Sequence, residues 1–295
     1  MPQVITLGEI LVDLVPEGRG YVLRPGGAPS NVAVNLARLG IKSGIIGKLG
    51  DDHPGAFLRS FLKSNKVDIS KVKITKKSGT GLVFVFLDAS GERSFSFYGE
   101  PSADKFLSVN DIDIPYINTC RVFHYGTISF MHPVSAKATI KAVIAAKKAG
   151  KVITFDPNVR LNLWKGRHGA ARRRIRGYFK YADVIKISDG ELKFLFGAKP
   201  AAGDLKRIFR PGQAVFISAG AKGCYAYHGG FFKYFPGLKV KAVDTTGAGD
   251  AFMAGVIAGV LRAGSLENLG PKEISRAAEL ANRLGAKAVA RKGAV

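Results

Sequence analysis

The residues best suited to chemistry lie together near the C-terminus, in residues 243–255. Glycines at 247 and 249 leave the backbone free to turn tightly, and the small, apolar residues that follow Asp250 predict a helix through residue 261. The unpaired N–H groups at a helix N-terminus, together with the helix dipole, favour an anion. The segment therefore predicts an anion site built from the backbone of Gly247, Ala248 and Gly249. Asp250, in the same first turn, is the candidate base beside that anion.

The elements that must position this turn follow an alternating pattern. From about residue 118 onward, short β-branched or aromatic runs alternate with amphipathic segments. We expect strands at 121–125, 151–156, 183–187 and 214–218, and helices at 133–149, 167–180 and 190–196. Nearer the N-terminus the pattern predicts a strand at 4–7 and a helix at 31–39. Strands separated by helices of this length are typical of βαβ units and a mostly parallel sheet.

One part of the N-terminal half does not fit this alternation. The runs 82–87 and 94–98 flank Ala89-Ser90-Gly91, which predicts an antiparallel hairpin. A hairpin cannot extend a parallel sheet without a crossover, so we place it outside the main sheet, as a lid. The expected architecture is a single α/β domain over 1–295. It has a central, mostly parallel sheet flanked by helices and a small β-sheet lid inserted from about 12–30 and 72–105.

The composition is that of a globular chain, with 46% hydrophobic and 23% charged residues, which argues against a disordered or fibrous protein. Its apolar runs are too short for a membrane span, and no targeting peptide is visible. Only Cys120 and Cys224 are present, which favours a reducing, cytoplasmic compartment. The net charge of +23 attracts polyanions without identifying one. The dense basic run at 165–180 is either a solvated helix face or a polyanion contact.

Six segments, in the same order, resemble the conserved blocks of the ribokinase-like (PfkB) carbohydrate kinases, and most of all the fructokinases among them. They are Gly8-Glu9, Gly27-Ala28-Pro29-Ser30-Asn31-Val32-Ala33-Val34, Pro101-Ser102-Ala103-Asp104, Phe123-His124-Tyr125-Gly126, Asp156-Pro157-Asn158-Val159-Arg160 and the run 243–252. The resemblance implies a ribokinase-like fold and ATP-dependent phosphorylation of a sugar. Neither a Walker A motif nor a protein-kinase glycine loop occurs.

By resemblance, Asp250 takes the proton of the sugar hydroxyl, while the amides of 247–249 hold the charge of the transferring γ-phosphoryl. The resemblance also places a group of residues against the sugar: Asp13, Gly26, Gly27 and Asn31. From their place on the predicted lid hairpin, we expect Phe97 and Tyr98 to cover the sugar. A carboxylate and a carboxamide suit a polyol, because its hydroxyls both donate and accept hydrogen bonds. Arg160 is expected to face the substrate and the phosphates, and does not by itself distinguish a neutral ketose from a sugar acid.

For the nucleotide, the resemblance implies a second set of residues: Lys186, Ser188, Ser218, Gly220, Gly223 and Asn282. Ser188 stands where the family has Asn, and Ser218 where it has Thr. Glu191 is expected to orient water on Mg²⁺, which usually keeps several waters. Asp244 and Thr246 are candidates for a monovalent cation such as K⁺.

The leading prediction is a fructokinase that uses ATP and Mg²⁺ to make fructose 6-phosphate. Two kinds of alternative stay open at this stage. One keeps the fold but takes 2-keto-3-deoxygluconate, ribose or a nucleoside as acceptor, and the other is a kinase-like scaffold that binds polyanions. We further expect a homodimer formed through the lid, since an exposed hairpin edge seeks a partner, with no specific nucleic acid and no membrane as partners.

Overall fold

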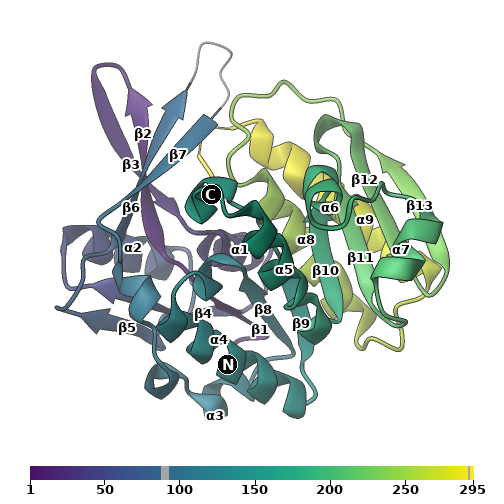
Figure 1. Cartoon of the computed structure of the whole chain (residues 1–295), viewed down its shortest axis with the longest axis horizontal. Helices are drawn as coiled ribbons and strands as arrows, with labels where there is room; N and C mark the ends of the chain where they lie inside the picture. The colour runs from purple at the N-terminus through teal and green to yellow at the C-terminus, as the bar shows by residue number, and fades with distance from the viewer. Residues whose placement is uncertain (88–92, 292) are drawn as a thin grey trace.

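The computed structural model describes residues 1–87, 93–291 and 293–295. Within them, nine strands form a central sheet in the order β13-β12-β11-β10-β9-β8-β1-β4-β5 (Figure 1). Their bounds are β1 Val4–Leu7, β4 Ser43–Gly50, β5 Val72–Thr75, β8 Val122–Gly126, β9 Val152–Asp156, β10 Val184–Ser188, β11 Ala214–Ser218, β12 Gly223–His228 and β13 Phe231–Pro236. All pairs from β5 to β11 are parallel, and β12 and β13 add an antiparallel edge. The predicted mostly parallel sheet is confirmed.

Helices cover both faces of this sheet, as its alternating side chains require. One face carries α4 (Pro133–Lys148), α5 (His168–Arg176), α6 (Asp189–Phe196) and α7 (Ala202–Ile208), packed on strand residues such as Ile5 and Phe123. The other carries α1 (Ala28–Arg38), α8 (Ala248–Ala263) and α9 (Pro271–Val289), packed on Val4 and Val122. Neighbouring residues of one strand therefore pack into the cores on opposite faces of the sheet. The remaining helices are α2 (His53–Ser64) and α3 (Ile114–Ile117).

The lid is a separate four-stranded sheet in the order β3-β2-β6-β7, with β2 Leu11–Glu17, β3 Gly20–Gly26, β6 Gly81–Leu87 and β7 Arg93–Tyr98. It stands away from the central sheet (Figure 1). Strands β6 and β7 pair antiparallel, as predicted, although the predicted turn at 89–91 lies outside the described residues. The lid strands span less than the predicted segments: β5, at 72–75, pairs with β4 of the central sheet, and α1 begins at Ala28.

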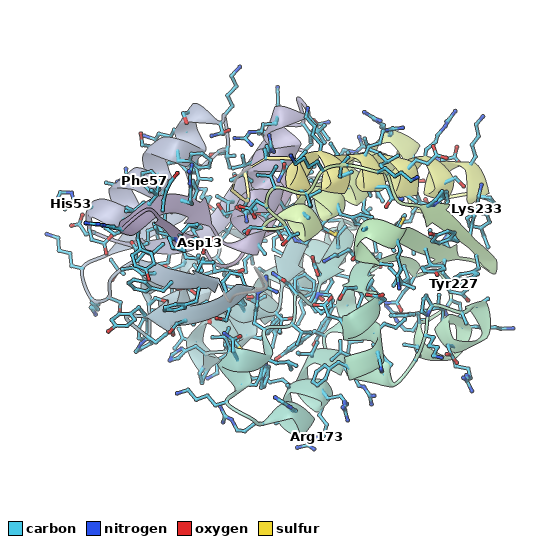
Figure 2. The ribbon with its side chains drawn as sticks, turned by 90° about the horizontal axis from the view of Figure 1, so that it is seen from above. Asp13, His53, Phe57, Arg173, Tyr227 and Lys233 are labelled. Carbon is cyan, nitrogen blue, oxygen red and sulfur yellow. The ribbon has the colours of Figure 1, made fainter. Side chains whose placement is uncertain are left out.

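The basic run at 165–180 is only partly helical, which corrects the predicted helix at 167–180. Helix α5 ends at Arg176, and Gly177 follows it. Arg172 and Arg176 cross to α6, where they donate to the carbonyls of Phe194 and Leu195 and where each guanidinium also lies over an aromatic ring. Arg173 instead projects from the outer margin of the molecule, as Figure 2 shows. Part of this run therefore serves packing rather than an open polyanion surface.

No helix in the described part of the chain is both long and apolar enough to cross a membrane.

Candidate active site

The turn singled out in the sequence begins α8. Gly247 caps this helix with φ of 74°, a left-handed conformation that favours glycine. The N–H of Ala248 makes a long hydrogen bond to the Thr245 carbonyl, at 3.3 Å. For the N–H groups of Gly247 and Gly249, no acceptor is found among the described residues. Two of the three amides expected to face an anion therefore remain available to one.

Two cavities meet at this turn. The larger, of about 740 Å³, is lined on this side by Thr245, Ala248 and Gly249. The smaller, of about 70 Å³, is lined here by Thr246, Gly247 and Asp250. Residues of one turn thus line both cavities, so groups bound in the two cavities can both reach this turn.

Asp250 is held in place by a residue 219 positions away in the chain. Its Oδ2 accepts a hydrogen bond from Nδ2 of Asn31, on α1, at 2.8 Å. Burial raises the pKa of Asp250, while the Asn31 bond and the charges of Lys186 and Arg160 oppose that rise. A carboxyl whose pKa lies above the ordinary value is a stronger base when ionised, which suits proton abstraction.

A buried ion pair lies directly beneath the turn. Nζ of Lys186 on β10 donates to Oδ2 of Asp156 on β9 at 2.9 Å, and the two side chains are 7% and 4% exposed. A Cβ placed on Gly249 would lie 3.1 Å from this Nζ, so glycine there allows the close approach. Burial works against the Lys186 charge, but Asp156, Glu191 and Asp250 outweigh it and keep its pKa above the ordinary value. The lysine thus places a fixed positive charge under the anion turn.

The smaller cavity gathers most of the residues predicted to face a sugar. Its lining includes Asp13, Gly27, Asn31, Phe97 and Arg160. Gly26 does not line it. A Cβ at Gly26 would lie 2.7 Å from Asp13 Oδ2, so this glycine makes room for the carboxylate.

One lid residue predicted to cover the sugar does not line the cavity. Tyr98 is 64% exposed and contacts Phe84 rather than the cavity. Successive residues of a strand point to opposite faces, so Tyr98 cannot share the face of Phe97. Phe95, two residues earlier, lines the cavity instead, with the Arg160 guanidinium 5.7 Å from its ring centre.

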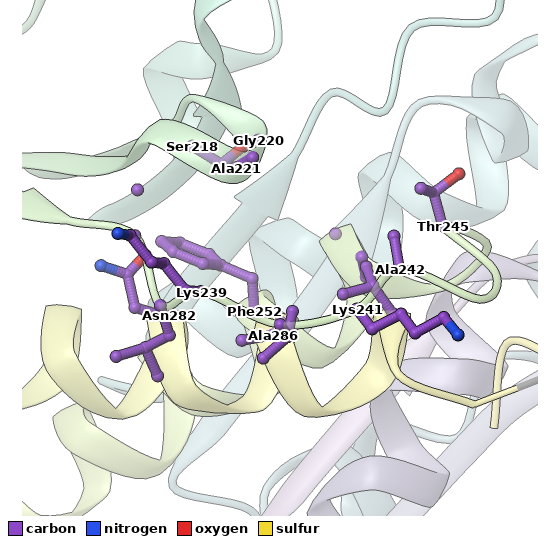
Figure 3. A pocket seen from close by; sticks show the side chains of 18 residues that line it. Ser218, Gly220, Ala221, Lys239, Lys241, Ala242, Thr245, Phe252, Asn282 and Ala286 are labelled. Atoms are coloured by element: carbon purple, nitrogen blue, oxygen red, sulfur yellow. The ribbon is translucent and has the colours of Figure 1, made fainter.

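The larger cavity collects the residues predicted for the nucleotide loop, namely Ser218, Gly220, Gly223 and Asn282. Figure 3 shows this cavity with Phe252 and Ala286 forming part of its wall, and Lys239 and Asn282 line it as well. Lys241 lies at the end nearer Thr245. Asn282 donates from Nδ2 to the carbonyls of Phe235 and Pro236, both at 3.3 Å, which joins α9 to the end of β13.

Two residues predicted to contact the nucleotide do not line this cavity. Lys186 is committed to the ion pair with Asp156, and Ser188 caps α6 in a reciprocal pair with Glu191. Oε2 of Glu191 accepts from both the N–H and the hydroxyl of Ser188, at 2.8 and 2.9 Å. Its Oε1 accepts from the N–H of Val159 at 2.6 Å. Glu191 therefore ties the start of α6 to the loop after β9.

The whole chain, residues 1–295, matches the model of the pfkB family carbohydrate kinases. The chain belongs to this family. Fructokinase-1 of Oryza sativa subsp. japonica is 38% identical over 303 residues, which cover 99% of this kinase and 93% of the relative.

Solved structures agree with this assignment. A fructokinase from Xylella fastidiosa with bound ATP superposes with a TM-score of 0.91 at 31% identity, covering 100% of this kinase and 94% of that chain. A fructokinase double mutant from Vibrio cholerae O395, in a form bound to fructose, ADP and potassium ion, gives a TM-score of 0.89 at 34% identity, with the same coverage. The predicted ribokinase-like carbohydrate kinase is confirmed as an ATP-dependent sugar kinase.

The smaller cavity of this kinase also contains residues that sequence reasoning did not assign. They are Glu9, Leu11, Ala28, Val83, Phe95, Ile128 and Asn158. Asn158 has a positive φ of 39°, uncommon outside glycine. Its place in the run Asp156-Pro157-Asn158, at the end of a strand, was the available signal. Glu9 lies two residues after the first strand, and its place in the block Gly8-Glu9 was the available signal.

Proposed function

We propose that the chain transfers the γ-phosphoryl group of ATP to a hydroxyl of D-fructose, giving fructose 6-phosphate. The observation that carries this proposal is the single turn that lines both cavities. Fructose is favoured as the acceptor because the curated relatives at about 40% identity are fructokinases, and because structural neighbours include fructokinases bound to fructose and sugar kinases bound to ATP.

Asp250 acts as the general base in this proposal. The acceptor hydroxyl, bound in the smaller cavity, loses its proton to the Asp250 carboxylate as its oxygen attacks the γ-phosphorus. The bond from that phosphorus to the bridging oxygen of ADP breaks, and the electron pair leaves with ADP. The turn at Gly247–Gly249 faces the oxygens of the transferring group, where its N–H groups and the charge of Lys186 offset the negative charge. Positioning and charge stabilisation are what phosphoryl transfer chiefly requires.

The remaining predicted residues divide between the two substrates. Asp13, Gly27 and Asn31 would bind the sugar hydroxyls, with Phe97 and Phe95 covering the ring and Arg160 between sugar and phosphates. Ser218, Gly220, Gly223 and Asn282 would border the nucleotide in the larger cavity. The lid then excludes water that would otherwise accept the phosphoryl group.

Mg²⁺ fits the charges beside the turn. Burial raises the pKa of Asp156, and Glu191 and Asp250 add to that rise, so three carboxylates repel one another there with Lys186 as their buried counter-charge. A divalent ion held chiefly by ATP phosphates would relieve this repulsion and neutralise charge on the transferring group, with Glu191 acting through water.

A monovalent cation fits a second place. The two oxygens of Asp244 accept from the N–H groups of Thr246 and Gly293, at 2.7 and 2.9 Å. A carboxylate oxygen can accept more than one bond, so Asp244, with Thr246, could still hold K⁺ beside the turn. Both cations are proposals for this chain.

The lid also suggests how two copies would associate. Its outer face exposes large apolar side chains, among them Tyr21, Leu23, Phe86 and Tyr98. A homodimer that packs this face against its counterpart would bury them. We expect Phe86→Lys to shift the protein from dimer to monomer, because it places a charge in that interface, as measured by light scattering after size exclusion. Lys233→Ala, at the far edge strand, serves as the control. A wild-type monomer, or a Phe86→Lys dimer, would contradict the proposal.

A sugar panel tests the function itself. With ATP and Mg²⁺, ADP release should be fastest with fructose, and the product should be fructose 6-phosphate. Ribose, 2-keto-3-deoxygluconate and nucleosides are less favoured, although an aminoimidazole riboside kinase is among the structural neighbours at 31% identity. Preference for one of these would overturn fructose as the acceptor while leaving the kinase activity in place.

A cytoplasmic setting is also proposed, since Cys120 and Cys224 are both free and buried.

A further inference from the structure

Glu9 has one carboxylate oxygen committed to the fold. It follows β1, and its Oε1 accepts the N–H of Ala28, the first residue of α1, at 3.1 Å. This bond satisfies one of the free donors at the helix N-terminus. Through it, Glu9 fixes the start of the helix that carries Asn31 to Asp250.

The other oxygen has no protein partner among the described residues. Glu9 is 2% exposed and lines the smaller cavity, yet its buried Oε2 makes no hydrogen bond. Oδ1 of Asn31, which lines the same cavity, is likewise buried without a partner among the described residues. Buried polar atoms are nearly always hydrogen-bonded, so each such orphan needs an explanation. Two orphaned acceptors in one cavity call for a ligand that donates to both.

Burial and the neighbouring charges bring the pKa of Glu9 close to 7. Burial raises its pKa to about 7, and the Asp104 carboxylate adds to that rise, while Lys105 and the backbone bonds oppose it. Lys105 is itself shared between Asp104 and Glu100. Across the cavity stand three further charged groups: Asp13, Arg160 and Asp250.

We propose that Glu9 is a specificity-determining residue that binds a hydroxyl of the acceptor sugar through Oε2, as a carboxylate. The inference rests on the proposed sugar-kinase function and adds a residue to its acceptor site. The hydroxyl donates to Oε2, and a neighbouring hydroxyl donates to Asn31 Oδ1. A sugar that lacks the first hydroxyl leaves a buried carboxylate unpaired, which is costly and therefore selective.

The sign of the pH effect follows from this role. Free enzyme near pH 7 holds Glu9 as a mixture of acid and carboxylate, whereas bound sugar requires the carboxylate. Binding therefore releases a proton, and sugar affinity falls as the pH drops below about 7. At pH 7 the release should approach ~0.5 proton per site.

The test variant is Glu9→Gln, which is nearly isosteric. Its single oxygen can still accept from the Ala28 N–H, but no acceptor then remains for the sugar. We expect the dissociation constant for fructose to rise roughly 10- to 100-fold, with thermal stability near that of the wild type. The proton release, measured by calorimetry in buffers of different ionisation enthalpy, should be lost. Glu279→Gln, on an exposed part of α9, is the matched control.

A panel of monodeoxyfructoses identifies the hydroxyl. The deoxyfructose that lacks the hydroxyl bound by Glu9 should bind the wild type weakly. It should bind Glu9→Gln no more weakly, because the sugar and the variant each remove one side of the same hydrogen bond. Unchanged fructose affinity in Glu9→Gln, proton release equal to the wild type, or losses that simply add for every deoxysugar would each overturn the role of Glu9. If the wild type binds and phosphorylates no fructose, the proposed acceptor fails instead, and the same measurements on the sugar it does phosphorylate test Glu9.

Discussion

Asp250→Asn is expected to lower kcat by ~10² to 10⁴, the usual contribution of a general base. Asparagine keeps the size of the side chain and can still meet Asn31, which now bonds Oδ2 at 2.8 Å. It cannot take the proton from the acceptor hydroxyl. ATP and fructose should bind with near wild-type affinity, since neither depends on that proton transfer. A coupled assay of ADP release, with calorimetric binding of each substrate, separates the two effects.

The control for this variant is Asp204→Asn, an equivalent change on the exposed helix α7. It should leave kcat unchanged. Near-normal turnover of Asp250→Asn would remove Asp250 from the base role. A large loss of ATP binding would instead mean that the side chain mainly maintains the turn.

Lys186→Met is expected to destabilise the folded protein by ~3–5 kcal/mol, because it leaves the Asp156 carboxylate buried and unpaired. The pair lies 2.9 Å apart with both side chains almost fully buried. Urea denaturation measures the loss as a fall in the free energy of unfolding. Lys193→Met, on the exposed face of α6, should change it by less than about 0.5 kcal/mol.

A double variant distinguishes an unpaired charge from simple loss of packing. Lys186→Met with Asp156→Asn removes both charges, while asparagine keeps an oxygen for the Asn158 N–H that Asp156 now accepts. Most of the lost stability should return. Equal stability of the single and double variants would show that the charge of Asp156 is not the cause.

The central sheet and the glycine turn could be predicted because their signals are local. Alternating strand and helix patterns predicted a mostly parallel sheet, and strands β9 to β11 lie within one residue of their predicted bounds. The turn combines Gly247, Gly249 and Asp250 in a few residues, so its chemistry is visible without the fold. The two cavities beside the turn could not be predicted, because their walls include elements more than 200 residues away in the chain.

What the sequence did not reveal depends on tertiary contacts and on the alternation of side chains along a strand. The ion pair of Lys186 with Asp156 could not be foreseen, because the two residues lie on neighbouring parallel strands and 30 positions apart in the chain. Tyr98 was placed over the sugar although alternation puts it on the face opposite Phe97. Glu9 belongs to the block Gly8-Glu9 but was left without a role, because only the fold shows that its second oxygen is buried without a partner.

A crystal structure with fructose and a non-hydrolysable ATP analogue tests the central claim most directly. We predict one fructose hydroxyl at roughly 2.6–3.2 Å from the Asp250 carboxylate, with the γ-phosphate facing the N–H groups of Gly247 and Gly249 and open to attack by that hydroxyl. A carboxylate turned away from the sugar, or a γ-phosphate bound elsewhere, would contradict the account.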